Sequence, residues 1–199
     1  MKLEEYKLVF IAVGLIGVLI FASPVLATFA GFPPGEQFSE LYILGPERMA
    51  ENYPFNVVAG QDYKVYVGVG NHMGSSVYYV VYVKLKNQAE PFPNATVGSP
   101  SPIPALYEYK FSIADDMVWE SPLVFSVVGA SFSANELVMK GITLNDVAFN
   151  VDKTAAWDMN ATGFYYQLFF ELWAYHPDSN SVQFDNRFTS LQLNLTRTD

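Results

Sequence analysis

The chain of 199 residues has room for one membrane segment and one ordinary domain. The formal net charge is −9, and the 11 Lys and Arg residues are scattered, which excludes a nucleic-acid-binding protein because binding to phosphates requires clustered basic side chains. Cysteine is absent, so disulfides, thiolate metal sites and cysteine nucleophiles are excluded as well.

Residues 8–30 predict a single transmembrane helix. They carry no charged side chain, and they exceed the roughly 20 helical residues that cross a bilayer core. Lys2 and Lys7 precede this run, whereas the next basic residue is Arg48. The positive-inside rule therefore places residues 1–7 in the cytoplasm and the rest of the chain outside the cell membrane.

A cleaved signal peptide is the alternative interpretation of the same segment. Small residues end at Ala27, shortly after the helix-breaking Pro24, and they would suit a signal peptidase. However, the apolar run is longer than the roughly 7 to 15 residues of a usual signal core. The length of the run favours an uncleaved signal anchor.

A Gly/Pro spacer over residues 31–36 leads to a predicted extracytoplasmic domain over residues 37–199. In this part of the chain apolar and polar residues alternate with period two between turn residues, which is typical of antiparallel sheets. We expect strands over residues 38–44, 54–58, 63–69, 76–86, 106–113, 122–128, 131–139, 142–151, 163–175 and 182–195. This pattern predicts an all-β fold, an immunoglobulin-like two-sheet β-sandwich, without giving its strand order.

Three features in the middle of this domain are expected to lie at its surface. Lys84 and Lys86 alternate with apolar residues in the fourth expected strand, so they indicate its outward face. Residues 70–74 are expected to form a turn. Five prolines occur within residues 87–104, and because proline cannot donate ladder hydrogen bonds, this stretch is expected to be a surface loop.

The aromatic segment over residues 164–173 resembles a second membrane span in composition. It is too short for one, and Gln167 and Glu171 interrupt it. A central strand that is buried on both faces is the better interpretation. Residues 163–175 are expected to form a hairpin with residues 182–195.

Three Asn-X-Thr sequons predict N-glycosylation, at Asn94, Asn160 and Asn194. Asn94 lies in the proline-rich loop and Asn160 precedes the aromatic strand, where a glycosylating enzyme could reach them. Asn194 is the weaker candidate because it falls within the last expected strand.

Three aromatic residues are candidates for contact with a glycan or a partner protein: Trp157, Trp119 and Tyr165. Aromatic faces pack well against the apolar faces of sugars. Such residues more often belong to a core, and Trp157 is the best candidate for contact because it lies in a polar stretch.

No catalytic motif occurs in the chain. His72 and His176 are the two histidines, and both are expected to be exposed in turns. Asp115, Asp116 and Asp158 lack the spacing of a calcium loop and are expected to be solvated turn residues. We therefore expect no enzyme activity, no metal and no cofactor.

Several stretches resemble an archaeal family of membrane-anchored proteins that is described only as a domain of unknown function. The stretches that carry this resemblance are residues 36–46, 50–57, 66–72, 79–87, 153–158 and 163–173. The resemblance implies an archaeal source, a membrane location and a β-rich outer domain, and it implies no activity or catalytic residue. Some relatives have several membrane helices before this domain, whereas this chain has one.

These observations favour a membrane-anchored, glycosylated cell-envelope protein that makes non-catalytic contacts with envelope proteins or glycans. One alternative is an accessory subunit of a larger membrane complex, in which the helix packs against partner helices. Another is a secreted filament subunit that is assembled by donor-strand exchange after cleavage near Ala27. An enzyme acting on envelope glycans is the last alternative. The sequence does not indicate an oligomeric state.

Overall fold

The computed structural model describes residues 6–30 and 36–197, and the chain divides into two compact units, Met1–Gln37 and Phe38–Asp199. The first unit contains one helix, α1 (Lys7–Ala30), of 24 residues. Among the described residues, no helix is both long and apolar enough to cross a bilayer. The predicted cytoplasmic residues 1–5 and spacer residues 31–35 lie outside the described residues.

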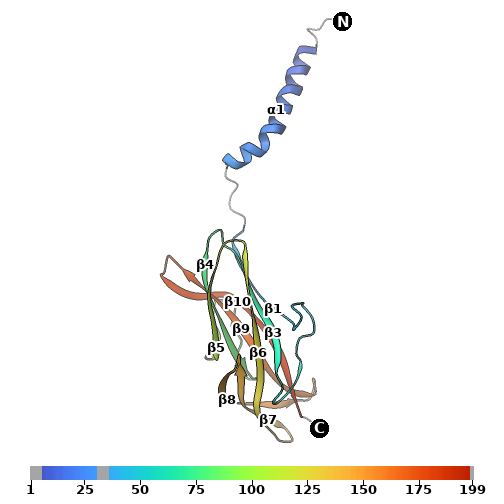
Figure 1. Cartoon of the computed structure of the whole chain (residues 1–199), viewed down its shortest axis with the longest axis vertical. Helices are drawn as coiled ribbons and strands as arrows, with labels where there is room; N and C mark the ends of the chain where they lie inside the picture. Colours follow the sequence, from blue (N-terminus) through green and yellow to red (C-terminus); the bar gives the residue numbers. More distant parts are fainter. Residues whose placement is uncertain (1–5, 31–35, 198–199) are drawn as a thin grey trace. The chain divides into compact units, whose positions relative to one another are not determined.

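The second unit is mostly β, as the sequence predicts (Figure 1). Its described residues form ten strands: β1 (Phe38–Leu44), β2 (Asn56–Val58), β3 (Tyr63–His72), β4 (Val77–Lys86), β5 (Tyr107–Ile113), β6 (Met117–Phe132), β7 (Glu136–Leu144), β8 (Val147–Asp158), β9 (Gly163–His176) and β10 (Ser181–Thr196). The hairpin predicted for the last two strands is confirmed, because β9 and β10 pair in antiparallel register.

The strands form one curled sheet in the order β1-β3-β6-β7-β8-β9-β10-β2, with β4 paired to β9 and β5 paired to β4. All these pairings are antiparallel except the short one between β2 and β10. β8 and β9 join through two residue pairs, Trp157 with Phe164 and Asp158 with Gly163. This narrow joint connects a first ladder (β1-β3-β6-β7-β8) to a second ladder (β5-β4-β9-β10-β2).

One hydrophobic cluster draws on both ladders, because the period-two pattern turns one face of each strand inward. Val65 and Phe125 enter it from the first ladder, and Leu172 enters it from the second. Tyr166 of β9 adds a polar link, since its hydroxyl lies 2.8 Å from the carbonyl oxygen of Leu137 in β7. The central strand β9 is buried on both faces over most of its length, which confirms the prediction.

The breaks predicted on either side of the expected strand over residues 131–139 are misplaced. β6 continues to Phe132 because Gly129, with φ of 78°, sits within the strand and pairing resumes at Ala130. Glycine adopts this conformation without steric cost, so here it marks an irregularity inside a strand and not a turn. The turn after β7 lies at Asn145 and Asp146, both with positive φ.

The turn predicted at residues 70–74 is also misplaced, because β3 runs on to His72. Gly70 pairs with Glu40 of β1 on one side and with Val118 of β6 on the other. The chain turns after His72, in residues 73–75.

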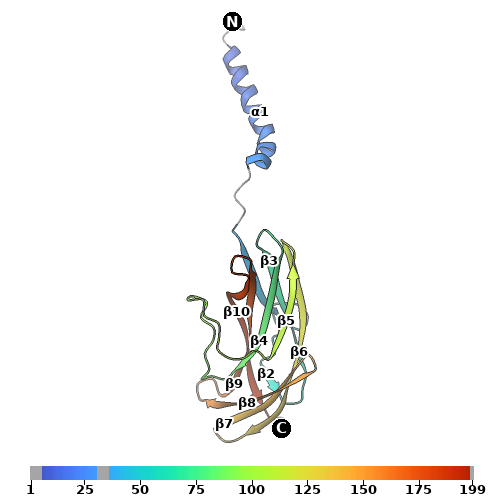
Figure 2. The ribbon, with the colours of Figure 1, turned by 90° about the vertical axis from the view of Figure 1, so that its left-hand side faces the viewer.

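The prediction that Lys84 and Lys86 mark an outward face is wrong, because each is only 5% exposed. The proline loop, defined here as residues 87–106, folds back over this face of the sheet. Figure 2 shows it as a long irregular green segment that connects β4 to β5 along the chain. Long side chains that would face solvent in an isolated ladder are therefore covered.

Candidate functional site

A pocket of the second unit lies beside the joint between β8 and β9. Residues 132–134 at the end of β6 and just after it, Trp157 of β8, residues 162–164 at the start of β9 and residues 194–197 at the end of β10 line it. Its volume is about 730 Å³, which is within the range of small-ligand sites. We call it the corner pocket.

Aromatic rings form one wall of the corner pocket. Trp157 is 42% exposed, and its ring meets that of Phe164 edge-on at 5.0 Å between centroids. Phe132 contacts Phe164 in a similar geometry at 6.1 Å. The tryptophan lies here because it pairs with Phe164 across the tight β8–β9 turn. An exposed indole held by its neighbours is a ready surface for an apolar ligand face.

The only ionisable side chain that lines the corner pocket among the described residues is Arg197. Its guanidinium carbon lies 4.8 Å from the centroid of Phe132, a cation–π arrangement. No hydrogen bond or ion pair joins Arg197 to another described residue. A pocket with a cationic lining stands out in a chain whose net charge is −9.

The opposite wall is the end of β10, held against β9 by Asn194. Its Oδ1 accepts a hydrogen bond from the Phe164 amide at 3.2 Å, and its Nδ2 donates to Oδ1 of Asn56 at 2.9 Å. A Cβ atom at Gly163 would lie 2.4 Å from Asn194 Oδ1, so this close approach requires glycine. The side chain of Asn194 thus fastens three strands together.

Of the three predicted contact residues, the corner pocket contains Trp157. Tyr165 is only 6% exposed, and its hydroxyl donates to the carbonyl oxygen of Ala161. Its ring contacts Phe55 at 6.1 Å. Tyr165 therefore packs beneath the surface beside the pocket and presents no free face.

Trp119 lies elsewhere, on β6. Its ring stacks on Phe111 at 3.7 Å with an interplanar angle of 12°, and Tyr109 meets it edge-on at 5.2 Å. Both neighbours belong to β5. The structure therefore assigns Trp119 a packing position between the two ladders and does not bring it together with Trp157.

The three sequon asparagines differ in their surroundings. Asn94 is exposed, and its Oδ1 accepts hydrogen bonds from the amides of Thr96 and Val97, which shapes a local turn. Asn160 is exposed in the turn between β8 and β9. Asn194 is half-buried and its amide is already hydrogen-bonded, so it is the poorest acceptor for a glycan.

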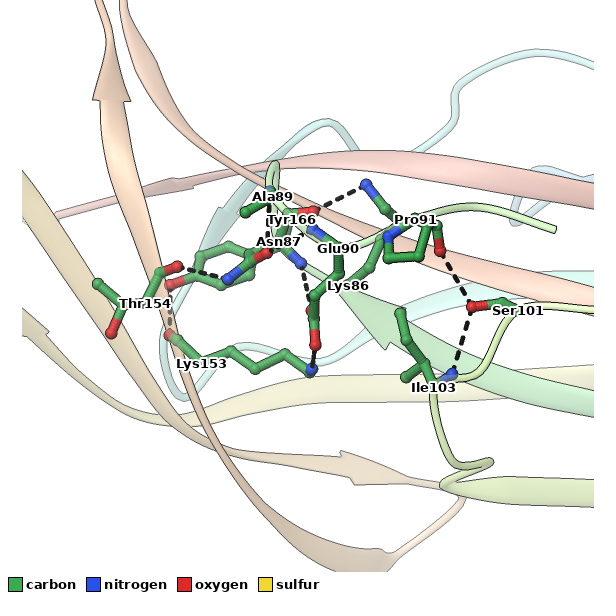
Figure 3. Close-up of polar contacts among 10 residues, drawn as sticks. All are labelled: Lys86, Asn87, Ala89, Glu90, Pro91, Ser101, Ile103, Lys153, Thr154 and Tyr166. Carbon is green, nitrogen blue, oxygen red and sulfur yellow. Dashed lines mark hydrogen bonds and ion pairs between the residues drawn. The ribbon is translucent and has the colours of Figure 1, made fainter.

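The proline loop is fastened to the edge of β8 by side chains (Figure 3). Asn87 Nδ2 donates to the carbonyl oxygen of Thr154 at 2.8 Å, and Glu90 forms an ion pair with Lys153. Gln88 adds a third bond, at 2.9 Å, to the carbonyl oxygen of Ala156. These contacts cap an edge of the sheet that would otherwise present free carbonyl groups to another strand.

A buried ion pair fastens the centre of the same loop. Lys84 Nζ lies 2.8 Å from Oε2 of Glu171, and it donates a second hydrogen bond to the carbonyl oxygen of Ser101 at 2.9 Å. Glu171 also accepts from the Ser101 amide and from Nε1 of Trp173. Since its oxygens are engaged, this glutamate is a structural group and not a free acid or base.

Lys86 lies under the start of the proline loop. Its Nζ lies 4.4 Å from the ring centroid of Phe92 and donates to the carbonyl oxygen of Asn87 at 2.8 Å. Burial lowers the pKa of the Lys86 ammonium group from its usual value. The loop therefore covers two lysines whose charge is matched by carbonyl groups and one carboxylate.

The histidines do not form a catalytic arrangement in the described part of the chain. His72 is the last residue of β3, half-buried and stacked on Phe38 at 4.7 Å, so the prediction of an exposed turn position is wrong for it. Its Nδ1 lies 3.0 Å from Asp116. His176 ends β9 and is exposed.

The candidate carboxylates support turns. Asp115 accepts a hydrogen bond from the Gly74 amide at 2.7 Å, and Asp158 accepts from the amides of Asn160 and Ala161. Within residues 6–30 and 36–197, no group of three or more His, Cys, Asp or Glu side chains is placed to hold a metal ion.

The sequence predicts only part of the pocket lining. Trp157 was accessible to sequence analysis because a tryptophan in a polar stretch is unusual. Arg197 was not, because nothing near it in the sequence indicates that the end of β10 lies against Phe132. The period-two pattern predicts strands, whereas the meeting of four chain segments at one corner depends on how the sheet curls.

The solved structures named below resemble this chain distantly. The CARDB domain of a Pyrococcus furiosus protein, solved with di-metal ions, aligns with a TM-score of 0.40 and 8% identity over 83% of this chain and 94% of that domain. A chain of the human complex of zinc 2-glycoprotein with prolactin inducible protein gives a TM-score of 0.40 and 10% identity, over 83% of this chain and 100% of that one. These likenesses are too weak to support an inference about function.

A β-glucosidase from Listeria innocua in complex with glucose gives a TM-score of 0.39 and 9% identity, over 83% of this chain but only 17% of the enzyme. None of the curated proteins compared with this chain matches it. One family model, described as a domain of unknown function (DUF1616), matches residues 33–133, which is just over half of the chain. The chain therefore belongs to the DUF1616 family.

Proposed function

We propose that this protein is a membrane-anchored cell-envelope protein whose outer domain binds envelope glycans or proteins without catalysing a reaction. The observation that carries the binding role is the corner pocket, with the exposed face of Trp157 in its wall. The charge-free run over residues 8–30 supports the anchor, with residues 1–7 in the cytoplasm and the β-domain outside. The archaeal source implied by the resemblance belongs to the same proposal.

The finer fold that we propose is an immunoglobulin-like two-sheet sandwich. In this arrangement the first and second ladders stack face to face and enclose the shared hydrophobic cluster between them. The short pairing between β8 and β9 is then the corner at which the chain passes from one sheet to the other. The corner pocket lies at that transition.

A glycan is the ligand that the pocket suits best. An indole face packs against the C–H face of a pyranose ring, and hydroxyl groups at Thr162 and Thr196 lie on the pocket walls. The volume of about 730 Å³ accommodates one or two sugar units. Binding sites of this kind combine an aromatic surface with a small number of polar groups.

The lining also supports a non-catalytic role. Most glycoside hydrolases use a pair of carboxyl groups, one as acid and one as base or nucleophile. Among the described residues that line the corner pocket there is no Asp, Glu or His. The described lining therefore offers a place to bind a sugar, and none of its described side chains is suited to exchange protons with the glycosidic oxygen.

Binding of oligosaccharides from the native envelope to the full chain in detergent tests the proposal. We expect saturable binding by calorimetry, and we expect Trp157→Ala to weaken it by about fivefold, since loss of an aromatic contact costs on the order of 1 kcal/mol. Tyr78→Ala is the matched control, because Tyr78 is similarly exposed on β4 and lies outside the pocket. If the two variants bind equally, the pocket is not the site.

Pull-downs from native membranes test the protein-partner branch of the same proposal. We expect at least one envelope component to be retained with the full chain and to be lost with Trp157→Ala. Recovery of this protein alone at every detergent strength would contradict an interaction role.

A further inference from the structure

We infer that the corner pocket recognises an acidic sugar, a saccharide unit that carries a carboxylate, with Arg197 binding the carboxylate and Trp157 packing on the sugar ring. This inference rests on the proposed glycan-binding function and names the chemical class of its ligand. It depends on the charge of the pocket and on which polar groups in it remain free.

The charge of the pocket points to an anion. Arg197 is the one ionisable residue among the described residues of the lining, in a chain with 20 acidic and 11 basic residues. The ion pairs of the described chain engage other basic residues, among them Lys84, Lys140 and Lys153, and no carboxylate of residues 36–197 forms an ion pair with Arg197. An arginine that lacks a carboxylate partner among these residues and lines a pocket is suited to bind a carboxylate from a ligand.

The guanidinium of Arg197 lies over an aromatic ring. Its carbon is 4.8 Å from the centroid of Phe132, so the ring covers one side of the guanidinium and the N–H donors remain for a ligand. A planar fork of this kind binds a carboxylate with two parallel hydrogen bonds. The exposed indole of Trp157 lines the same cavity and provides a face for the ring that carries the carboxylate.

The hydroxyl groups in the pocket suit the remaining part of a sugar. The hydroxyl of Thr162 donates to the carbonyl oxygen of Ala161 at 2.8 Å, and that of Thr196 donates to Val57 at 3.4 Å. Because these protons are used within the protein, the two hydroxyl oxygens are left as acceptors. Sugar hydroxyls can donate to them, whereas the carboxylate requires the donors of Arg197.

Trigalacturonate and its methyl ester form the matched pair of probes, because esterification removes the negative charge and keeps the sugar ring. We expect calorimetry on the full chain in detergent to show that the acid binds at least about tenfold more tightly than the ester, since charge-assisted hydrogen bonds are the stronger class. Arg197→Gln should abolish this preference and leave binding of the ester unchanged. Trp157→Ala should weaken both probes.

Three controls make the test specific. Lys110→Gln removes a positive charge from an exposed strand outside the pocket and should leave the preference intact. Arg197→Lys keeps the charge but loses the planar fork, and it should restore only part of the preference. Thermal unfolding of Arg197→Gln should match that of the parent, so that lost binding reflects lost recognition.

The outcomes separate the inference from the proposed function. Equal binding of acid and ester, both lost in Trp157→Ala, overturns the acidic-sugar inference and leaves a glycan-binding pocket. Binding of acetate or sulfate as tightly as trigalacturonate also overturns it, because the site would then hold a simple anion. Failure of both probes together with all native envelope oligosaccharides overturns the glycan-binding function itself.

Discussion

Lys84 of β4 and Glu171 of β9 form an ion pair that is almost completely removed from solvent, with side chains 6% and 0% exposed. Both groups have further partners: Lys84 donates to Ser101, and Glu171 accepts from Ser101 and Trp173. The pair therefore binds the centre of the proline loop to the sheet. Burial of two charges is costly, and it is tolerated when the geometry and the additional hydrogen bonds are good.

Lys84→Met is expected to lower the free energy of unfolding by about 3–5 kcal/mol, because it leaves the carboxylate of Glu171 buried without its partner. Urea denaturation of the full chain, followed by tryptophan fluorescence, measures the loss. Trp173 donates to the same carboxylate and reports directly on this region.

The double variant Lys84→Met, Glu171→Leu should recover part of that loss, because it removes both charges and keeps the buried volume but leaves the Ser101 amide and Trp173 Nε1 without their acceptor. Lys110→Gln breaks an exposed ion pair with Glu108 and should have no measurable effect. A double variant that is no more stable than Lys84→Met would show that the uncompensated charge is not the cause.

The second prediction concerns the fastening of the proline loop to β8. Asn87→Ala removes the bond from Nδ2 to Thr154, and it also removes the acceptor for the amides of Ala89 and Glu90. We expect faster hydrogen–deuterium exchange at those two amides and a loss of about 1–2 kcal/mol in unfolding free energy.

Gln183→Ala is the matched control for this loop experiment, because it removes an exposed side-chain amide near the start of β10, far along the chain from residues 87–90. It should leave exchange at Ala89 and Glu90 unchanged. Equal exchange in the parent and in Asn87→Ala would mean that the loop is held by its other contacts, such as the Glu90–Lys153 ion pair and the packing of Phe92 on Phe169.

The buried lysine shows why part of the structure was predictable and part was not. Alternation of apolar and polar residues predicted β1, β4 and the β9–β10 hairpin, because each residue position along a strand faces one side of the sheet. The same alternation assigned Lys84 to solvent. It cannot report that a distant loop covers a face, so the ion pair with Glu171 was beyond it.

The candidate site was predictable to a similar degree. The sequence indicates Trp157 as a contact residue because it lies in a polar stretch, and Trp157 lines the pocket. The sequence also indicates Trp119 as a contact residue, but Trp119 stacks on Phe111 outside the pocket. Arg197 was not identified, because its relationship to Phe132 depends on tertiary structure. Residue type indicates which side chains could bind a ligand, and only the curl of the sheet decides which of them meet.

The third prediction concerns Asp185, which lies in the β10 bulge beside Arg187. Burial raises the pKa of this carboxyl above its usual value of 3.8, while Arg187, Ser39 and His176 act to lower it. A carboxyl whose pKa is higher in the folded state contributes stability below the unfolded pKa and loses it as the pH rises through the folded pKa. The charged form of Asp185 therefore opposes folding.

Asp185→Asn removes this titration. As the pH rises from about 3.8 through the raised pKa, we expect this variant to become more stable relative to the parent, which is to say that its free energy of unfolding increases relative to that of the parent. Urea denaturation at a series of pH values measures the difference. Arg187→Gln removes the nearby positive charge, so the pKa of Asp185 should rise further. The loss of stability that accompanies ionisation of Asp185 should then extend to higher pH than in the parent. A difference between Asp185→Asn and the parent that does not vary with pH contradicts the assignment.

The last prediction joins the anchor to the sequons, and peptide mapping by mass spectrometry of protein from native membranes tests both. We expect an intact N-terminal peptide over residues 1–7 and glycan on Asn94 and Asn160, which are exposed in turns. Asn194 should be unmodified, because its amide is hydrogen-bonded to Phe164 and Asn56.

Thr96→Ala and Thr162→Ala each destroy one sequon and keep its asparagine, so each should remove glycan from its own site alone. Glycan on Asn194 would mean that the end of β10 is not held against β9 by the Asn194 side chain, which contradicts the arrangement of the corner pocket. A mature N-terminus near Thr28 would overturn the anchor. In that case the freed chain would have no apolar helix to hold it at the membrane, and donor-strand assembly of a secreted filament would become the function to test.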